Sequence, residues 1–395
     1  MDTMETLTAQ PQVSVIVPAR NEESCLAECL QSLTAQTGVA FEIIVVDDHS
    51  TDRTREIATS FPGVRVIEAG PLPDGWTGKN NAVTAGARSA FGAFPVFGAP
   101  PALSSRAEKI DREANDLRIR GACFSSPESP PTKWLLFTDA DTVHLPGSLA
   151  AALKEAQENC AELLSYSPEQ IAVTFWEMAT LPVVFAELAR QYSPSKVSDP
   201  ASTLAAANGQ YILIRRDAYD AVGGHAAISS NILEDVALAR AVKSSGRRIR
   251  FRYAGTAVRT RMYRNYRQLR DGWTKNLALL FPRPGWLAAK SLFVSSLPWA
   301  AVFLTIGGLA KHLWWSVFVV LALVWPMARL RRANFDWTME FLGAFFGMPM
   351  FAYLLLRSKR AHANGSVSWK GRTYDPKEPM HELPHHTPST AGRLS

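Results

Sequence analysis

Short apolar runs alternate with helical segments along the first part of the chain. Four runs have the length and β-branched content of buried strands: VSVIVPA (13–19), EIIVVDD (42–48), VRVIEA (64–69) and KWLLFTDAD (133–141). Between the first two, apolar residues recur at helical spacing on one side, namely Cys25, Leu26, Cys29, Leu30 and Leu33. Strands that alternate with helices predict an α/β fold built on one sheet.

Polar residues gather where these predicted strands end. They are Asn21, Asp47, Asp48, Asp139 and Asp141. Open α/β sheets bind ligands beyond the carboxyl ends of their strands. On an extended chain Asp139 and Asp141 would point to the same face, where two carboxylates repel each other unless a cation lies between them. The pair is therefore a solvated turn, a general acid/base pair, or half of a magnesium or manganese site.

After Trp286 the chain becomes strongly apolar. Three segments are candidate membrane spans, the last two slightly short: 291–310, 313–328 and 341–356. Their basic flanks and border tryptophans favour membrane insertion over buried core helices. With a cytosolic catalytic domain, two spans would return the basic segment 329–332 to the cytoplasm, whereas a third full span would leave 357–360 outside. A re-entrant or interfacial third segment would resolve this conflict.

Two other segments interrupt the catalytic part. Residues 171–189 are apolar but carry Glu177 and Pro182, so an interfacial helix lying on the membrane is expected, with a core helix as the alternative. Residues 91–132, rich in Pro, Ser and Gly, are expected to form a surface insertion, with a lid over the site as the alternative. The expected organisation is a catalytic domain (1–285), a membrane domain (286–360) and a polar tail (361–395).

Charge is unevenly distributed. The excess of Lys and Arg over Asp and Glu is 42 − 36 = +6, but Arg240 to Arg270 holds eleven basic residues and no acid. A diphosphate-binding or anionic-lipid-facing surface explains this density better than a solvated face, and the apolar segments that follow favour a membrane over nucleic acid. The four cysteines form no CxxC pair, as expected for reduced thiols, and the acidic start lacks the features of a signal peptide.

Four motifs occur in a fixed order along the chain: VIVPARNEE, VVDDHSTD, GWTGKNNA and FTDAD. As an ordered set they resemble the family 2 glycosyltransferases, over roughly residues 12–90 and 133–280. This resemblance implies a GT-A nucleotide-sugar-binding domain with a mixed, mostly parallel sheet, followed by C-terminal transmembrane helices. It also implies transfer by a single in-line displacement with inversion.

The resemblance assigns donor-side roles to nine residues. The loop that borders the base and ribose corresponds to Pro18, Ala19, Asn21 and Glu22. Asp47 and Asp48 correspond to the base contact, and Lys79 to a lysine near the base or diphosphate. Asp139 and Asp141 would hold a divalent cation, Mg²⁺ or Mn²⁺, which stabilises the departing diphosphate. His144 as a further ligand is less expected than a surface histidine.

The acceptor side involves five further residues. Glu234 and Asp235 open a predicted helix, where acids commonly complement the helix dipole. The resemblance makes Asp235 the general base that an acceptor hydroxyl needs, with Glu234 supporting it. Gly209 would allow close approach of the acceptor. Trp273 and Lys275 would line its entrance or touch the diphosphate, with a packed interfacial tryptophan as the alternative.

One departure from the family bears on the substrate. Processive polysaccharide synthases carry Gln-x-x-Arg-Trp, whereas here Gln268 is followed by Asp271-Gly272. The segments GWTKN and SWKGRTY are more similar to carotenoid- and hopanoid-associated glycosyltransferases. We therefore expect a multi-pass cell-membrane enzyme, with its catalytic domain in the cytoplasm, that moves one sugar from a UDP-linked donor to a lipid hydroxyl. The alternatives are a polysaccharide synthase, a polyprenyl-phosphate glycosyltransferase and an inactive sugar-nucleotide-binding scaffold.

Overall fold

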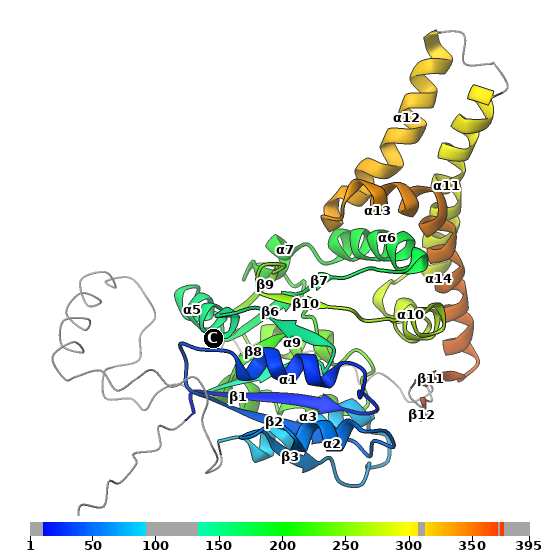
Figure 1. Ribbon diagram of the computed structural model, residues 1–395. Helices are drawn as coiled ribbons and strands as arrows, with labels where there is room; N and C mark the ends of the chain where they lie inside the picture. The colour runs from blue at the N-terminus through cyan, green and yellow to red at the C-terminus, as the bar shows by residue number, and fades with distance from the viewer. Residues whose placement is uncertain (1–10, 92–132, 307–312, 370–371, 375–395) are drawn as a thin grey trace, which may run out of the picture.

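A seven-stranded sheet forms the centre of the computed structural model, which describes residues 11–91, 133–306, 313–369 and 372–374 (Figure 1). The strand order is β3-β2-β1-β4-β8-β6-β9. The strands are β1 (Val13–Ala19), β2 (Phe41–Asp47), β3 (Arg65–Glu68), β4 (Trp134–Phe137), β6 (Leu163–Ser167), β8 (Ile212–Arg215) and β9 (Ile249–Tyr253). Strand β8 runs antiparallel to β4 and β6, and the other neighbours pair in parallel. The predicted mixed, mostly parallel sheet is confirmed.

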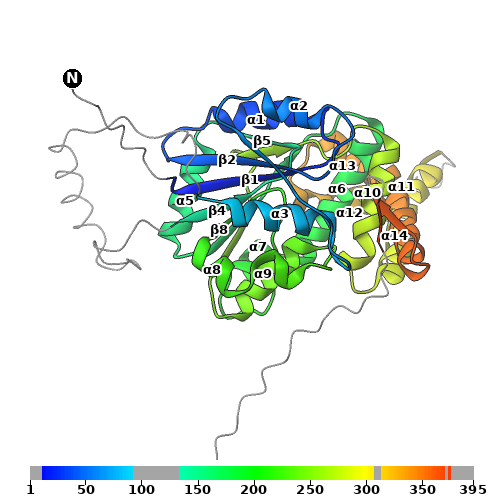
Figure 2. The same cartoon turned by 90° about the horizontal axis from the view of Figure 1, so that it is seen from below.

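Helices cover both faces of this sheet (Figure 2). One face packs against α1 (Leu26–Thr34), α2 (Thr54–Thr59) and α5 (Ser148–Glu158). The other packs against α3 (Gly78–Ser89), α8 (Arg216–Ala221) and α9 (Glu234–Ser244). The strands between these two layers are buried on both sides, which explains their continuous apolar runs. The predicted apolar face of α1 is confirmed, because all five of its residues are buried.

The fourth strand is shorter than predicted. It ends at Phe137, and Asp139 and Asp141 lie in a turn in which the N–H of Thr142 donates to the carbonyl oxygen of Asp139 at 3.2 Å. The extended-chain geometry expected for the two aspartates is therefore wrong. A small sheet follows at once, in the order β5 (Thr142–His144), β10 (Val258–Thr260) and β7 (Glu169–Gln170). The Thr260 hydroxyl donates to the carbonyl oxygen of Asp141 at 3.1 Å and so anchors the turn.

The C-terminal helices form a separate layer beside the sheet. They are α10 (Tyr266–Leu280), α11 (Pro284–Ile306), α12 (Leu313–Leu330), α13 (Trp337–Leu342) and α14 (Met348–Ala363), with η3 (Arg331–Ala333) and the π-helical turn η4 (Gly343–Gly347) between them. Helices α11 and α12 project beyond the body as a hairpin, and α6 (Phe175–Gln191) and α13 run across its base (Figure 1). Helix α14 descends beside α11 and packs against α10 (Figure 1).

Two of the described helices are long and apolar enough to cross a membrane by length and composition. They are Pro284–Ile306 and the continuous run Trp337–Ala363, and α12 is not among them, so the predicted set of three spans is unconfirmed. The most apolar window of Trp337–Ala363 is 67% buried, against 39% for Pro284–Ile306. The third predicted segment therefore packs against protein over most of its surface.

Helix α6 occupies the segment expected to lie on a membrane. It begins with a capping box, in which the Thr174 hydroxyl accepts from the N–H of Glu177 and the Glu177 carboxylate accepts from the N–H of Thr174. Its middle is buried, which fits the core-helix alternative, whereas Phe175 and Trp176 at its start are exposed.

The remaining described elements are short. They are α7 (Pro194–Ser198), η1 (Gly224–Ile228) and the hairpin of β11 (Val367–Trp369) with β12 (Arg372–Tyr374), which falls on the segment SWKGRTY. Apart from Phe91, the expected insertion 91–132 lies outside the described residues, as does the tail beyond residue 374.

Candidate active site

A cavity of about 330 Å³ opens at the carboxyl ends of β1, β2 and β4, and helices α6, α9 and α10 form its opposite side. Twelve of the fourteen predicted site residues line it: Pro18, Ala19, Glu22, Asp48, Lys79, Asp139, Asp141, Gly209, Glu234, Asp235, Trp273 and Lys275. Asn21 and Asp47 do not. Residues distant in the sequence thus meet in one cavity, where open α/β sheets bind ligands.

Lys79 lies at the centre of the charged groups. It stands in the first turn of α3, where the Thr77 side chain accepts from the N–H of Asn80 and fixes the start of the helix. Its Nζ lies 2.7 Å from Asp139 Oδ1 and 2.8 Å from Glu234 Oε1. Burial alone would lower the pKa of Lys79, but the two carboxylates outweigh it and hold this pKa well above the ordinary value. A permanent positive charge therefore joins the end of β4 to the start of α9.

Asp235 is held by two backbone groups. Its Oδ2 accepts from the N–H of Gly209 at 3.0 Å, and its Oδ1 accepts from the N–H of Val236 at 2.8 Å. Burial and then the neighbouring Glu234 raise the pKa of Asp235 to about 6. Burial would raise the pKa of Glu234 too, but Lys79 and Lys275 outweigh it and lower that pKa. Adjacent carboxyl groups with pKa values pushed apart are typical of acid/base sites.

Gly209 is packed against this charged cluster. A Cβ there would lie 3.0 Å from Lys79 Nζ, 3.2 Å from Glu234 Oε1 and 3.6 Å from Asp235 Oδ2. The missing side chain lets the Gly209 backbone donate to Asp235. A side chain at this position would thus meet the charged cluster, and the expected approach of the acceptor to Gly209 stays a prediction.

The opposite side of the cavity is largely apolar. Trp273 is 3% exposed and packs edge-on against Phe185 at 6.3 Å and Tyr263 at 5.8 Å between ring centroids. It is thus a packed tryptophan that also lines the cavity. Lys275 on the same helix is partly buried, and this desolvation lowers its pKa, although Glu234 opposes the shift. Other residues complete the wall: Leu188, Tyr192, Tyr253, Met262 and Leu280.

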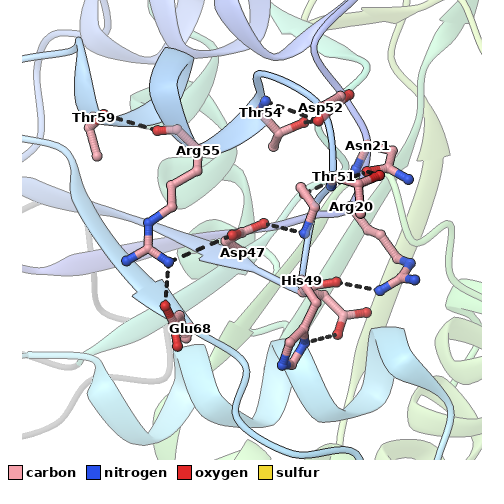
Figure 3. Close-up of polar contacts among 12 residues, drawn as sticks. Arg20, Asn21, Asp47, His49, Thr51, Asp52, Thr54, Arg55, Thr59 and Glu68 are labelled. Carbon is pink, nitrogen blue, oxygen red and sulfur yellow. Dashed lines mark hydrogen bonds and ion pairs between the residues drawn. The ribbon is translucent and has the colours of Figure 1, made fainter.

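Asn21 and Asp47 shape the loops behind the cavity (Figure 3). The Asn21 side-chain oxygen accepts from the N–H of Thr51 at 2.8 Å, and Asp47 accepts from the N–H of Ser50 at 3.1 Å. Asn21 thus ties the loop after β1 to the loop after β2, Asp47 stabilises the loop after β2, and Asp48 lines the cavity. Sequence reasoning missed Arg20, which lines the cavity and donates to the carbonyl oxygen of Asp48 at 2.6 Å. Its position inside VIVPARNEE was the available signal.

The basic side chains of the segment Arg240–Arg270 do not line the cavity. None of its eleven basic residues is among the described residues that line it, so the expected diphosphate-binding surface is not placed there. Several pair with acids of other elements, as Arg259 does with Glu169 at 2.7 Å and Arg261 with Glu177 at 3.2 Å. The segment itself contains no acid, but several of its basic residues form ion pairs with acids of other elements in the folded chain.

His144 is buried instead of exposed, so the expected surface histidine is wrong. The side chain is 2% exposed, and its Nε2 lies 3.0 Å from the Thr138 hydroxyl. Burial lowers the pKa of His144 to about 3, so the imidazole is neutral in the core.

A divalent cation fits Asp139 and Asp141 only together with a substrate. Both side chains offer hard oxygen donors to the cavity. Within the described part of the chain, no three or more His, Cys, Asp and Glu side chains are grouped to hold a metal ion by themselves. Mg²⁺ is commonly bound by one or two carboxylates plus substrate phosphates, which matches this donor set.

Two family models and several sequence relatives match the chain. The family model "Glycosyl transferase family 2" matches residues 14–97, and "Glycosyl transferase family 21" matches residues 183–378. The 4,4'-diaponeurosporenoate glycosyltransferase of Staphylococcus aureus strain USA300 is 26% identical over 376 residues, which cover 92% of this chain and 88% of the relative. That of strain MRSA252 is 26% identical over 384 residues.

Two solved structures are similar. The mannosyltransferase PcManGT of Pyrobaculum calidifontis, in complex with GDP-Man and Mn²⁺, is 18% identical, covers 83% of this chain and 87% of its own, and has a TM-score of 0.44. S. aureus TarS is 14% identical, covers 89% of this chain and 55% of its own, and has a TM-score of 0.39.

The sheet, the acidic cavity and the family matches define the chain as a glycosyltransferase. Within that class, residues 14–97 match the family 2 model that the ordered motifs predicted, and residues 183–378 match the family 21 model.

Proposed function

We propose that the enzyme moves a single sugar, with inversion, from a UDP-linked donor to the hydroxyl group of a membrane lipid. The observation that supports this proposal is one cavity with two chemically different sides. Asp139, Asp141 and Lys79 stand on the polar side, Phe185 and Trp273 on the apolar side. A donor diphosphate suits the first and an apolar acceptor the second.

In this proposal Asp235 acts as the general base. It takes the proton of the acceptor hydroxyl as that oxygen attacks the anomeric carbon, and the bond from this carbon to the diphosphate breaks. The N–H of Gly209 orients the carboxylate, and Glu234 holds Lys79 in place. When bound by Asp139 and Asp141, Mg²⁺ or Mn²⁺ supplies positive charge to the departing diphosphate. Lys79 adds to that charge.

A carotenoid- or hopanoid-type lipid is our first choice of acceptor, followed by a polyprenyl phosphate or a glycerolipid. The first choice is supported by relatives named for diaponeurosporenoate. On the helical hairpin Phe293, Phe303 and Ile306 are 67%, 69% and 78% exposed, and a lipid environment suits such side chains. We propose that the hairpin spans the membrane, that the run from α13 to α14 is interfacial, and that the catalytic domain (1–285) faces the cytoplasm.

The test is to incubate membranes that contain the enzyme with labelled nucleotide sugars. The lipids are then extracted, and their masses are determined by mass spectrometry. We expect one hexose on a lipid with a UDP-linked donor, and none with membranes that lack the enzyme. The acceptor panel includes hydroxylated and carboxylated carotenoids, because the relatives' names denote a carboxylate. A polymeric or water-soluble product would contradict the proposal.

The pH dependence should reflect Asp235. A general base acts when unprotonated, and the pKa of Asp235 is raised to about 6. The protonated fraction therefore grows as the pH falls through 6, and kcat/KM is expected to fall with it. Initial rates between pH 5 and pH 8 in a constant-ionic-strength buffer check this, and an unchanged rate down to pH 5 contradicts it.

Metal binding should depend on Asp141. Asp141→Ala and a chelator are each expected to weaken binding of the nucleotide sugar, and the chelator should have no further effect on the variant. Isothermal titration with and without Mn²⁺ measures both. Asp217→Ala, which removes an exposed carboxylate in the first turn of α8, is the matched control. Chelator-independent binding by the unmodified enzyme would exclude the cation.

A further inference from the structure

A second cavity, of about 380 Å³, lies where the hairpin leaves the catalytic body. We call it the base pocket. It is lined by the end of α6, the connection from α10 to α11, and the first turns of α11: Arg190, Gln191, Phe281, Pro282, Arg283, Trp286 and Leu287. It shares no lining residue with the active-site cavity.

Positive charge exceeds negative charge around the base pocket. Glu187 is contacted by three cations, with distances of 2.7 Å to Arg190, 3.3 Å to Arg329 and 3.9 Å to Lys290. Arg283 lines the same pocket, and no ion pair of its side chain is present among the described residues. Arg190 and Arg283 thus line the pocket, and Arg329 and Lys290 share Glu187 with Arg190, so basic side chains outnumber the single carboxylate and leave donors for an anion.

Tryptophans flank these cations on both helices of the hairpin. Lys290 Nζ lies 5.4 Å from the centre of the Trp286 ring, and the Arg329 guanidinium lies 5.0 Å from that of Trp325. Trp286 is 63% exposed. Tryptophan and basic residues together are typical of the level at which lipid headgroups lie. Because Trp286 and Arg283 stand at the start of α11, this level coincides with the base of the hairpin.

We propose that the base pocket binds the phosphate of an anionic phospholipid headgroup, such as that of phosphatidylglycerol. An arginine guanidinium group can donate two parallel hydrogen bonds to two oxygens of one phosphate. Basic pockets beside membrane helices attract anionic headgroups. The exposed apolar surface of α11 lies next to the pocket and offers a place for the acyl chains. This inference rests on the membrane anchorage in the proposed function, but it requires no sugar transfer.

The experiment counts bound lipids. The full-length protein is purified in a neutral detergent, mixed with equal amounts of phosphatidylglycerol and phosphatidylcholine, and examined by native mass spectrometry. The double variant Arg190→Gln/Arg283→Gln neutralises two basic residues of the pocket. The matched control, Arg53→Gln/Lys154→Gln, neutralises two exposed basic residues on α5 and in front of α2. The unfolding temperature of each protein in the same detergent shows that it is folded.

We expect the unmodified protein and the control to retain phosphatidylglycerol in preference to phosphatidylcholine. In the pocket variant, the ratio of bound phosphatidylglycerol to bound phosphatidylcholine should fall by roughly tenfold or more. Equal retention by the pocket variant, or no preference in the unmodified protein, overturns the inference. So does displacement of phosphatidylglycerol by inorganic phosphate at equal concentration, which would show a site for free phosphate. If the protein retains phosphatidylglycerol but transfers no sugar, this inference stands and the proposed function is wrong. If the protein transfers sugar to a lipid but shows no preference for phosphatidylglycerol, the proposed function stands and this inference is wrong.

Discussion

Asp235→Asn is expected to lower the rate of sugar transfer by about 10²–10⁴-fold, the usual contribution of a general base. The side-chain oxygen of asparagine can still accept from the N–H of Gly209, as Oδ2 of Asp235 does. It cannot take a proton from the acceptor. The nucleotide sugar should bind nearly as before, because its expected contacts lie on Asp48, Asp139 and Asp141. Initial rates at saturating substrate and isothermal titration of the donor measure the two effects.

A control substitution at a second aspartate distinguishes the loss of the general base from the loss of a negative charge in general. Asp217 also stands in the first turn of a helix, but it is exposed and pairs with Arg215. Asp217→Asn should leave both rate and binding unchanged. If Asp235→Asn loses donor binding as strongly as it loses rate, the residue maintains the fold of the site. If the rate survives, the base is a different group.

The sequence predicted which residues line the site better than it predicted the contacts that these residues make with other elements. Apolar strands that are followed by Asp48 and Asp139 imply a shared edge of the sheet, because the carboxyl ends of parallel strands meet there. Sequence alone did not reveal that Lys79 joins Asp139 to Glu234, since this contact depends on how α3 and α9 pack. The same holds for the raised pKa of Asp235, which requires burial.

Other errors arise from interactions across the fold. The segment Arg240–Arg270 contains no acid, yet Arg259 and Arg261 find carboxylates on other elements. His144 is the last residue of the short strand β5, and its burial depends on the packing of α1 against this strand. Just beyond α1, Gln36 donates to the carbonyl oxygen of His144 at 3.3 Å. The pattern of apolar and charged residues in a segment predicts the structure of that segment. Contacts with elements distant in the sequence depend on how those elements pack, which the pattern does not show.

The C-terminal layer illustrates the same limit and corrects an experiment that the sequence alone suggests. The expected domain boundary at residue 285 suggests that removal of the chain after it would free a soluble catalytic domain. In the structure α14 packs against α10 and α6, and the Ser358 hydroxyl accepts from the N–H of Ala278 at 2.9 Å. Such a cut would expose the face of α10 that packs against α14, and α10 carries Trp273 and Lys275 of the cavity wall. Substitutions at single positions therefore test this layer better.

Gly347→Ala is expected to destabilise the enzyme by ~3 kcal/mol or more, because the C-terminal layer meets α6 at this residue. A Cβ on Gly347 would lie 1.8 Å from the carbonyl oxygen of Ala179, a backbone atom that cannot rotate away. Helix α6 and the turn η4 would have to separate. Since α6 also carries Phe185 and Leu188 of the cavity wall, the KM for the lipid acceptor should rise as well.

Two further glycines provide a graded control in the same helical layer. A Cβ on Gly343 would lie 2.8 Å from a methyl group of Leu330, which can move, so Gly343→Ala should cost only ~1 kcal/mol. A Cβ on Gly285 would meet only the end of Lys359 at 3.6 Å, so Gly285→Ala should change stability by less than ~0.5 kcal/mol. All three substitutions exchange glycine for alanine within helical segments, so the differences between them reflect mainly the steric cost. Unfolding followed by circular dichroism in detergent measures the series. Equal stability of the three variants would show that α6 and η4 are not in close contact.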